Sequence, residues 1–148
     1  MENISFNHTK VKNIVPLAKL PGLSRISLDA TQVTSIRPLA DLVKLKSLSL
    51  DRTPVKNLVP ALLLPELLSL SLSGTQVRSS DFSSVSLSAS KLRFIWLDDT
   101  HAVELDALAE LADLSYLSLD RTRLTHIAPV SAMKNLDTFP LVLQAPTI

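Results

Sequence analysis

Several residue types are missing or scarce in this sequence of 148 residues. It has no cysteine, two glycines, one tryptophan and one tyrosine. The absence of cysteine excludes disulfides, thiolate nucleophiles and the usual structural zinc sites. With two glycines against nine prolines, most turns must be made without glycine. The sequence therefore predicts a fold whose turns depend on other residues.

Long apolar runs are also missing. The longest stretch, PALLLPELL at residues 60–68, is interrupted by proline and glutamate, and a membrane span needs ~20 apolar residues. The first ten residues, MENISFNHTK, lack the basic and apolar regions of a secretory signal. These absences predict a cytoplasmic protein without membrane contact. They leave delivery as a secreted effector open.

Common catalytic motifs are absent as well. The sequence contains no G-x-G-x-x-G, no phosphate-binding loop and no H-E-x-x-H. Serines are abundant, but a catalytic serine needs a base within hydrogen-bond reach, and His8 near Ser5 has no obvious acid to orient it. His101 follows Asp99 and precedes Glu104, a combination that often arises by chance. We expect no enzyme activity, no cofactor and no metal.

The formal net charge of +1 hides an uneven distribution. Residues 1–60 carry nine Lys and Arg against four acids, whereas residues 61–148 carry six against ten. Five basic residues stand one or three positions after the recurring threonines described below, and we expect them to line one solvated edge: Lys10, Lys12, Lys56, Arg78 and Arg123. A nucleic-acid partner is not expected, because no aromatic residues interleave with these cations.

A repeat explains most of the remaining pattern. The hexapeptide LSLDRT stands at residues 48–53 and again at 117–122. Threonines recur at intervals of 22 residues, with one interval of 25: Thr9, Thr31, Thr53, Thr75, Thr100 and Thr122. Apolar residues precede each threonine by five and three positions, as in Leu48 and Leu50. This alternation has period two and predicts a short strand with one buried face in every unit.

The consensus L-x-x-L-x-L-x-x-T-x-V resembles the leucine-rich repeat, with threonine at the position usually held by asparagine or cysteine. The unit length and the second half, I-x-P-L-A-x-L, resemble the short, internalin-like class common in bacteria. The resemblance implies an α/β solenoid, a right-handed superhelix with one parallel sheet of about six to seven short strands on the concave face. It covers residues 1–148 as a single domain of about seven units. The last unit is degenerate, with Gln144 at the threonine position.

The second half of the units predicts short 3₁₀ or α turns on the convex side. Four of these segments start near a proline, which suits the first helical position because it lacks an N–H: Pro16, Pro38, Pro60 and Pro129. The serine-rich segment 79–90 makes one unit three residues longer than its neighbours. There, Phe82 and either Val85 or Leu87 are expected to occupy the convex apolar positions. Insertions in such repeats often lie on the binding side.

Outward positions of the strands define the candidate site. If the apolar pairs point inward, Phe94, Trp96 and Tyr116 point onto the concave surface of two adjacent strands. The residues that border them are charged: Asp98, Asp99, Asp120 and Arg121. An aromatic cluster with a charged rim is typical of an interface hot spot. The alternative is that the three rings pack against residues 79–90 as a small additional core.

A column of acids also points outward at Asp29, Asp51, Asp98 and Asp120. It could receive basic groups of a partner. For Asp29 and Asp51 we favour a solubilising surface, with possible pairing to Arg52 and Arg121.

Leucine-rich repeats chiefly bind proteins, so the resemblance implies a non-enzymatic recognition module. The expected partner is a protein, with a basic patch opposite the acidic rim. Within this class the sequence does not distinguish a bacterial effector, a toxin-neutralising protein and a scaffold. The alternative is a structural segment of a larger repeat protein, or a homo-oligomer formed through uncapped ends that expose the leucine column and a sheet edge.

Overall fold

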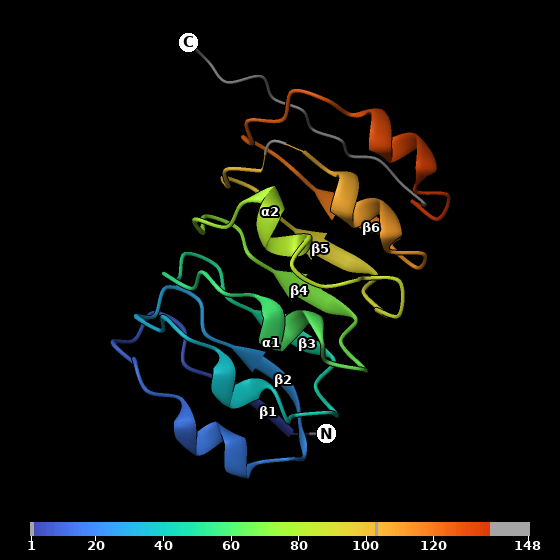
Figure 1. Cartoon of the computed structure of the whole chain (residues 1–148). Helices are drawn as coiled ribbons and strands as arrows, with labels where there is room; N and C mark the ends of the chain where they lie inside the picture. Colours follow the sequence, from blue (N-terminus) through green and yellow to red (C-terminus); the bar gives the residue numbers. More distant parts are fainter. Residues whose placement is uncertain (1, 103, 137–148) are drawn as a thin grey trace.

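The computed structural model describes residues 2–102 and 104–136. Six short strands form one parallel sheet in which each strand pairs with the next strand along the chain (Figure 1). The strands are β1 (Glu2–Ser5), β2 (Leu23–Ser27), β3 (Ser47–Ser49), β4 (Ser69–Ser71), β5 (Phe94–Trp96) and β6 (Tyr116–Ser118). The expected α/β solenoid is confirmed, because each of the six described units contributes one strand and one short helical turn.

The register of the sheet follows the sequence repeat. Ile26 pairs with Leu48, and Leu48 pairs with Leu70. Across the longer unit Leu70 still pairs with Ile95, 25 residues further on, because the extra residues are accommodated outside the strands. Equivalent residues therefore stack in columns, as repeat proteins require.

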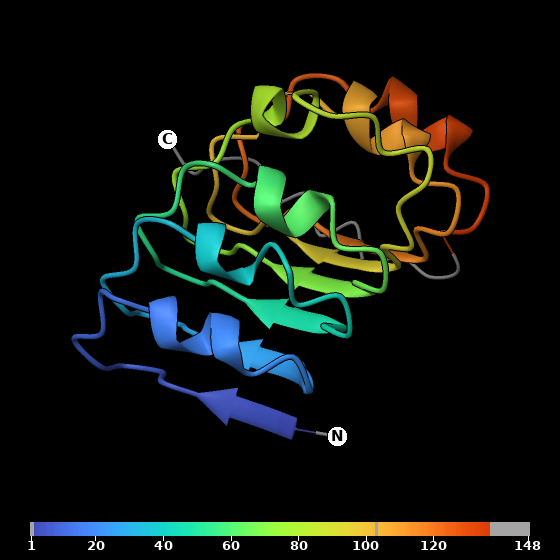
Figure 2. The ribbon, with the colours of Figure 1, turned by 60° about the horizontal axis from the view of Figure 1, so that its bottom comes forward.

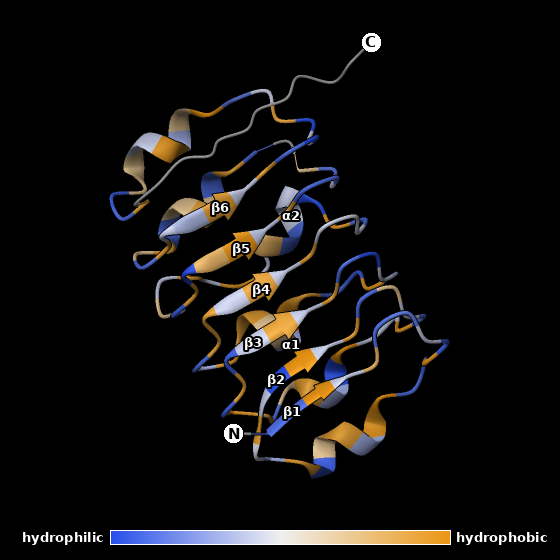
Figure 3. Ribbon diagram, turned by 180° about the vertical axis from the view of Figure 1, so that it is seen from behind, coloured by the Kyte–Doolittle hydropathy of each residue, from blue (hydrophilic) through white to orange (hydrophobic). Residues whose placement is uncertain are grey.

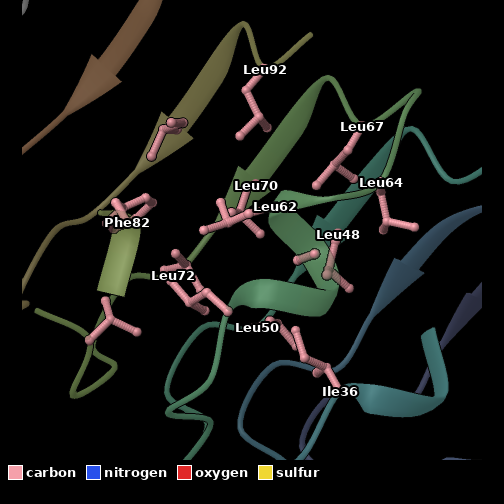
Figure 4. Packing of buried hydrophobic residues seen from close by; sticks show 14 of the residues in the cluster. Ile36, Leu48, Leu50, Leu62, Leu64, Leu67, Leu70, Leu72, Phe82 and Leu92 are labelled. Atoms are coloured by element: carbon pink, nitrogen blue, oxygen red, sulfur yellow. The ribbon is translucent and has the colours of Figure 1, made fainter. Parts of the chain in front are cut away.

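One apolar core lies between the sheet and the helical turns. Leu48 and Leu70, the inward residues of the two central strands, have at most 1% of their surface exposed. They pack against residues of the turns, such as Leu62 (Figure 4). Each unit is too small to enclose its own leucines, so their burial depends on the units on either side.

Short helical turns cover the side of the molecule opposite the sheet (Figure 2). They are η1 (Val15–Lys19), η2 (Arg37–Leu39), α1 (Val59–Leu62), α2 (Ser79–Phe82), η3 (Asp106–Glu110) and η4 (Ala128–Ala132). A proline stands at the first or second position of η1, η2, α1 and η4. The prolines thus initiate these turns as predicted, without losing a needed hydrogen bond.

The serine-rich segment 79–90 belongs to this convex layer. α2 packs between α1 and η3, and its first turn is closed by a 2.7 Å hydrogen bond from the Arg78 N–H to Asp81. Phe82 and Leu87 are buried in the core, and Val85 is partly buried against it. Phe82 and Leu87 therefore occupy the convex apolar positions of this unit, as predicted. However, the segment lies on the face opposite the strands (Figure 2) and not on the face that carries the candidate site.

The threonine column closes the end of each strand. The Thr31 hydroxyl donates to the carbonyl of Leu28 at 2.7 Å, and the same bond recurs from Thr53, Thr75, Thr100 and Thr122. All five threonines are buried. A buried hydroxyl without a partner is costly, and this carbonyl accepts its hydrogen in addition to the backbone N–H of the same threonine at Thr31, Thr53 and Thr75. The degenerate seventh unit lies outside the described residues, apart from its first apolar residue, Leu136.

Candidate functional site

Three aromatic rings form a continuous cluster on the outward face of β5 and β6, here called the aromatic patch (Phe94, Trp96 and Tyr116). The rings of Phe94 and Trp96 are stacked, with centroids 6.4 Å apart. Trp96 and Tyr116 lie at 5.2 Å with tilted planes. The Arg93 guanidinium lies 5.7 Å from the centre of the Phe94 ring, a cation–π arrangement. The predicted placement of the three aromatics side by side is therefore observed.

The aromatic patch is separate from the hydrophobic core. Phe94 is 36% exposed, and Trp96 and Tyr116 are half-buried. None of the three belongs to the core cluster, whereas Phe82 of the serine-rich segment does. Because that segment lies on the convex layer (Figure 2), it does not cover the rings. The alternative of an additional core against residues 79–90 is not supported by this arrangement.

A ladder of side-chain hydrogen bonds runs along the same face. The Oδ1 atom of Asp98 accepts from the Ser118 hydroxyl at 2.6 Å and from the backbone N–H of Asp120 at 2.7 Å. Asn7, Asp29 and Asp51 make the same pair of bonds to the next unit. This serine–aspartate ladder joins neighbouring units and satisfies one backbone N–H at each step. The sequence showed the acidic column but not its hydrogen bonds to the serines of the next unit.

The ladder corrects the solubilising role favoured for Asp29 and Asp51. The Oδ1 atom of each carboxylate accepts two hydrogen bonds within the chain, and both residues are only half-exposed. Burial raises the pKa of Asp51 above its ordinary value, and this effect outweighs the hydrogen bond from Ser71, which lowers it. These carboxylates support the sheet, and Arg52 is a minor influence on Asp51.

The ladder is interrupted at the aromatic patch. In the fourth unit Ser73 stands where the others have an acid or asparagine, and in the fifth unit Trp96 stands where the others have serine. The acceptor and the donor of this step are thus replaced together. An aromatic ring can occupy the outward position at this step without leaving a carboxylate unpaired.

Charged residues border the patch at the C-terminal ends of the strands, as predicted. Arg121 donates to both carboxylate oxygens of Asp99, at 2.6 and 2.7 Å, and to Oδ2 of Asp120 at 2.9 Å. The hydrogen bonds from Arg121 lower the pKa of Asp99, and the same contact raises the pKa of Arg121. Oδ1 of Asp120 is buried and accepts no hydrogen bond in the part of the chain that the structure describes. Much of the acidic rim is therefore engaged internally.

A column of left-handed residues follows the ladder, and sequence reasoning missed it. The residue just before each threonine has φ between 53° and 69°: His8, Ala30, Arg52, Gly74, Asp99 and Arg121. Glycine favours this conformation, yet one of the six is glycine, so composition gave no signal. The conformation turns the chain from the strand into the ascending loop and sets the positions of Asp99 and Arg121.

A groove of about 650 Å³ lies on the concave face beside the aromatic patch. Phe94 and Trp96 line one end, and Arg25 and Lys46 contribute cations. Serines of the middle strands, Ser47 and Ser69, lie between them. Figure 3 views this face, with the hydrophilic starts of β1 and β2 in blue. Sequence reasoning did not connect Arg25 and Lys46 to the aromatics.

Within residues 2–102 and 104–136, no three His, Cys, Asp or Glu side chains gather as a metal site would require. The helices among these residues are all too short or too polar to cross a bilayer.

Comparisons with known proteins give matches among solved structures only. No protein-family model matches the sequence, and no curated protein sequence matches it. Solved structures do match. Internalin C2 of Listeria monocytogenes has a TM-score of 0.79 and 28% identity, with 88% of this chain and 57% of that chain covered. An internalin (inlF) of the same species has a TM-score of 0.65 and 22% identity, with 93% and 46% covered.

More distant matches share the fold. One is a protein of a Drosophila melanogaster SNF/U2A′ complex, at a TM-score of 0.65 and 20% identity, with 92% of this chain and 82% of that chain covered. The chain spans about half the length of the two internalins. The threonine-ended strands, the stacked leucines and the convex turns agree with these matches in showing the fold. The chain has the leucine-rich-repeat fold, and internalins are among its structural neighbours.

Proposed function

We propose that this chain is a non-enzymatic protein-recognition module that binds its partner on the concave face, with the aromatic patch as the anchor. The observation that carries the proposal is the stack of Phe94, Trp96 and Tyr116 at outward positions, outside the core. Leucine-rich-repeat neighbours in solved structures include members of protein complexes. This supports a protein as the partner.

Physical reasons favour the patch as an anchor. Aromatic side chains offer large apolar area and lose few rotamers on binding, so they are enriched at hot spots. Their positions are fixed before binding, because β5 and β6 are held in register with the rest of the sheet. A preformed surface lowers the ordering cost of association.

The acidic rim gives weaker support to the basic patch expected on the partner. Both oxygens of Asp99 already accept from Arg121, and Oδ1 of Asp98 is used in the ladder. A partner cation would have to compete with these contacts. We therefore assign the main role to the rings and a secondary role to Asp98, Asp99, Asp120 and Arg121.

The test is a quantitative capture experiment with immobilised protein and lysate of the source organism. Wild type is compared with Trp96→Ala/Tyr116→Ala, and each variant is first shown to be folded by circular dichroism. The matched control is Val15→Ala/Leu63→Ala, which removes exposed apolar side chains, 57% and 62% exposed, from the convex turns. A protein retained by wild type and control but lost by the aromatic variant supports the proposal. Equal capture by all three contradicts it.

A second candidate is a structural, self-associating repeat segment. The observation in its favour is that Ile4 and Phe6 are only partly buried, whereas their equivalents Ile26 and Leu28 are fully buried. Another unit or another copy packed on β1 would cover them. Light scattering tests this directly: a dimer that Phe6→Ser dissociates supports it, and a monomer at all concentrations contradicts it.

A further inference from the structure

The groove beside the aromatic patch contains cations that the chain itself does not neutralise. Arg25 and Lys46 are exposed, and neither forms an ion pair with any described residue. The carboxylate of Glu66 is paired with Lys91 at 2.7 Å, and this hydrogen bond is the main cause of its lowered pKa, to which Lys46 adds least. The two cations are therefore available to a ligand.

The floor of the groove adds neutral donors. Ser47 and Ser69 lie on adjacent strands between the cations and the rings. Other outward serines, such as Ser49 and Ser71, donate to the ladder carboxylates. By contrast, the hydroxyls of Ser47 and Ser69 make no hydrogen bond to the residues that the structure describes. Hydroxyl donors next to cations form a suitable surface for carboxylate oxygens.

We propose that this groove binds an extended acidic segment of the partner protein, with carboxylates at Arg25 and Lys46 and an apolar side chain on Phe94 and Trp96. The inference rests on the proposed function, since it names the chemistry of the partner for that same face. It differs from the sequence-based expectation of a basic partner, which considered only the acids at the opposite ends of the strands.

The geometry sets the spacing of the segment. Arg25 is on β2 and Phe94 is on β5, with β3 and β4 between them. Three steps of ~4.8 Å make this separation ~14 Å, and an extended chain rises ~3.3 Å per residue. The acidic residue and the apolar residue should therefore be about four positions apart.

Charge complementarity favours a protein segment over a nucleic acid. The carboxylates of Asp29, Asp51 and Asp98 run along the same concave face. They would repel a continuous phosphate backbone, which needs several cations along its length. A short peptide can place its carboxylates at the cations and keep neutral residues beside the acids. Electrostatic attraction of this kind also speeds association at low salt.

The test uses the intrinsic fluorescence of Trp96, the single tryptophan of the chain, which lines the groove. The probes are peptides of about ten residues with two glutamates and a phenylalanine about four positions away, and matched peptides with lysine for glutamate. We expect saturable emission changes with the glutamate peptides only, weakened by salt. Arg25→Glu/Lys46→Glu should weaken binding at least about tenfold.

The matched control is Lys19→Glu/Lys44→Glu, which changes the net charge equally at exposed residues outside the groove; it should stay within about twofold of wild type. Absence of binding to every peptide, equal binding of lysine peptides, or equal weakening by the control overturns the inference. So does stronger competition by an oligonucleotide, or a self-association that Arg25→Glu/Lys46→Glu abolishes. If a captured partner depends on Trp96 and Tyr116 but not on Arg25 and Lys46, the proposed function stands and this inference fails.

Discussion

Ser71 donates its hydroxyl hydrogen to Oδ1 of Asp51 in the preceding unit, and the same oxygen accepts the backbone N–H of Ser73 at 2.9 Å. One carboxylate oxygen thereby connects two strands and accepts the backbone N–H of Ser73. The relationship repeats along the concave face. It makes the acids structural parts of the sheet, and this has measurable consequences.

Replacing Asp51 separates its charge from its role as an acceptor. Asp51→Asn keeps Oδ1, as Asn7 already does at its own step, so its free energy of unfolding at neutral pH should equal or exceed that of wild type. Asp51→Ala leaves the Ser73 N–H without its acceptor and should lose about 1–3 kcal/mol. Urea unfolding measures both. A larger loss in Asp51→Asn than in Asp51→Ala would contradict the ladder.

The raised pKa of Asp51 predicts a specific pH dependence. Since burial raises the folded-state pKa above the unfolded value of 3.8, the folded state binds its proton more tightly. The contribution is fully present below the unfolded pKa and is lost as the pH rises through the folded pKa. We expect the stability of Asp51→Asn relative to wild type to increase over that range, measured by urea unfolding at several pH values. A constant difference would contradict the raised pKa.

The interrupted ladder step can be rebuilt. Trp96→Ser with Ser73→Asp restores the donor and the acceptor found at the other steps, whereas each single change supplies only one of them. A double-mutant cycle of unfolding free energies should show a favourable coupling of about 1 kcal/mol. Additive effects would indicate that no bond forms between the new side chains.

The threonine column has an internal control. Thr75 is 2% exposed and donates to the Leu72 carbonyl, so Thr75→Val should lose about 1 kcal/mol or more. Thr9 makes the same bond to Phe6 but is exposed. Water can replace that bond, and Thr9→Val should change the unfolding free energy little. Equal losses at both positions would show that burial does not decide the cost.

The left-handed column makes Gly74 sensitive to substitution. A Cβ atom at Gly74 would lie 2.8 Å from Cγ of Arg52, at a φ of 69°. Gly74→Ala should therefore lose roughly 1–2 kcal/mol. Ala30→Gly, at an equivalent position with a φ of 53°, relieves strain and should change stability in the opposite direction or not at all. Thermal unfolding compares the two; a stabilised Gly74→Ala would be inconsistent with the observed φ.

The sequence alone determined the repeat, the strands and the site aromatics. The threonine spacing located every described strand, because an alternating pair of apolar residues precedes each threonine. Such a pair, for example Leu48 and Leu50, is buried at the strand. The prolines located four helical turns, because their fixed φ and missing N–H suit a first helical turn. Trp96 and Tyr116 were placed together, because equivalent positions of adjacent units become neighbours in a parallel sheet.

Tertiary structure alone decided how the polar groups are used. Whether Asp51 faces solvent, an arginine or a serine depends on distances between units, and these follow from the stacking of the sheet. The left-handed conformation of Arg52 and Arg121 is imposed by the turn from strand to loop, and no residue type in the sequence signals it. Likewise, Arg25 and Phe94 are 69 residues apart in sequence, and they line one groove because three strand spacings separate them in space.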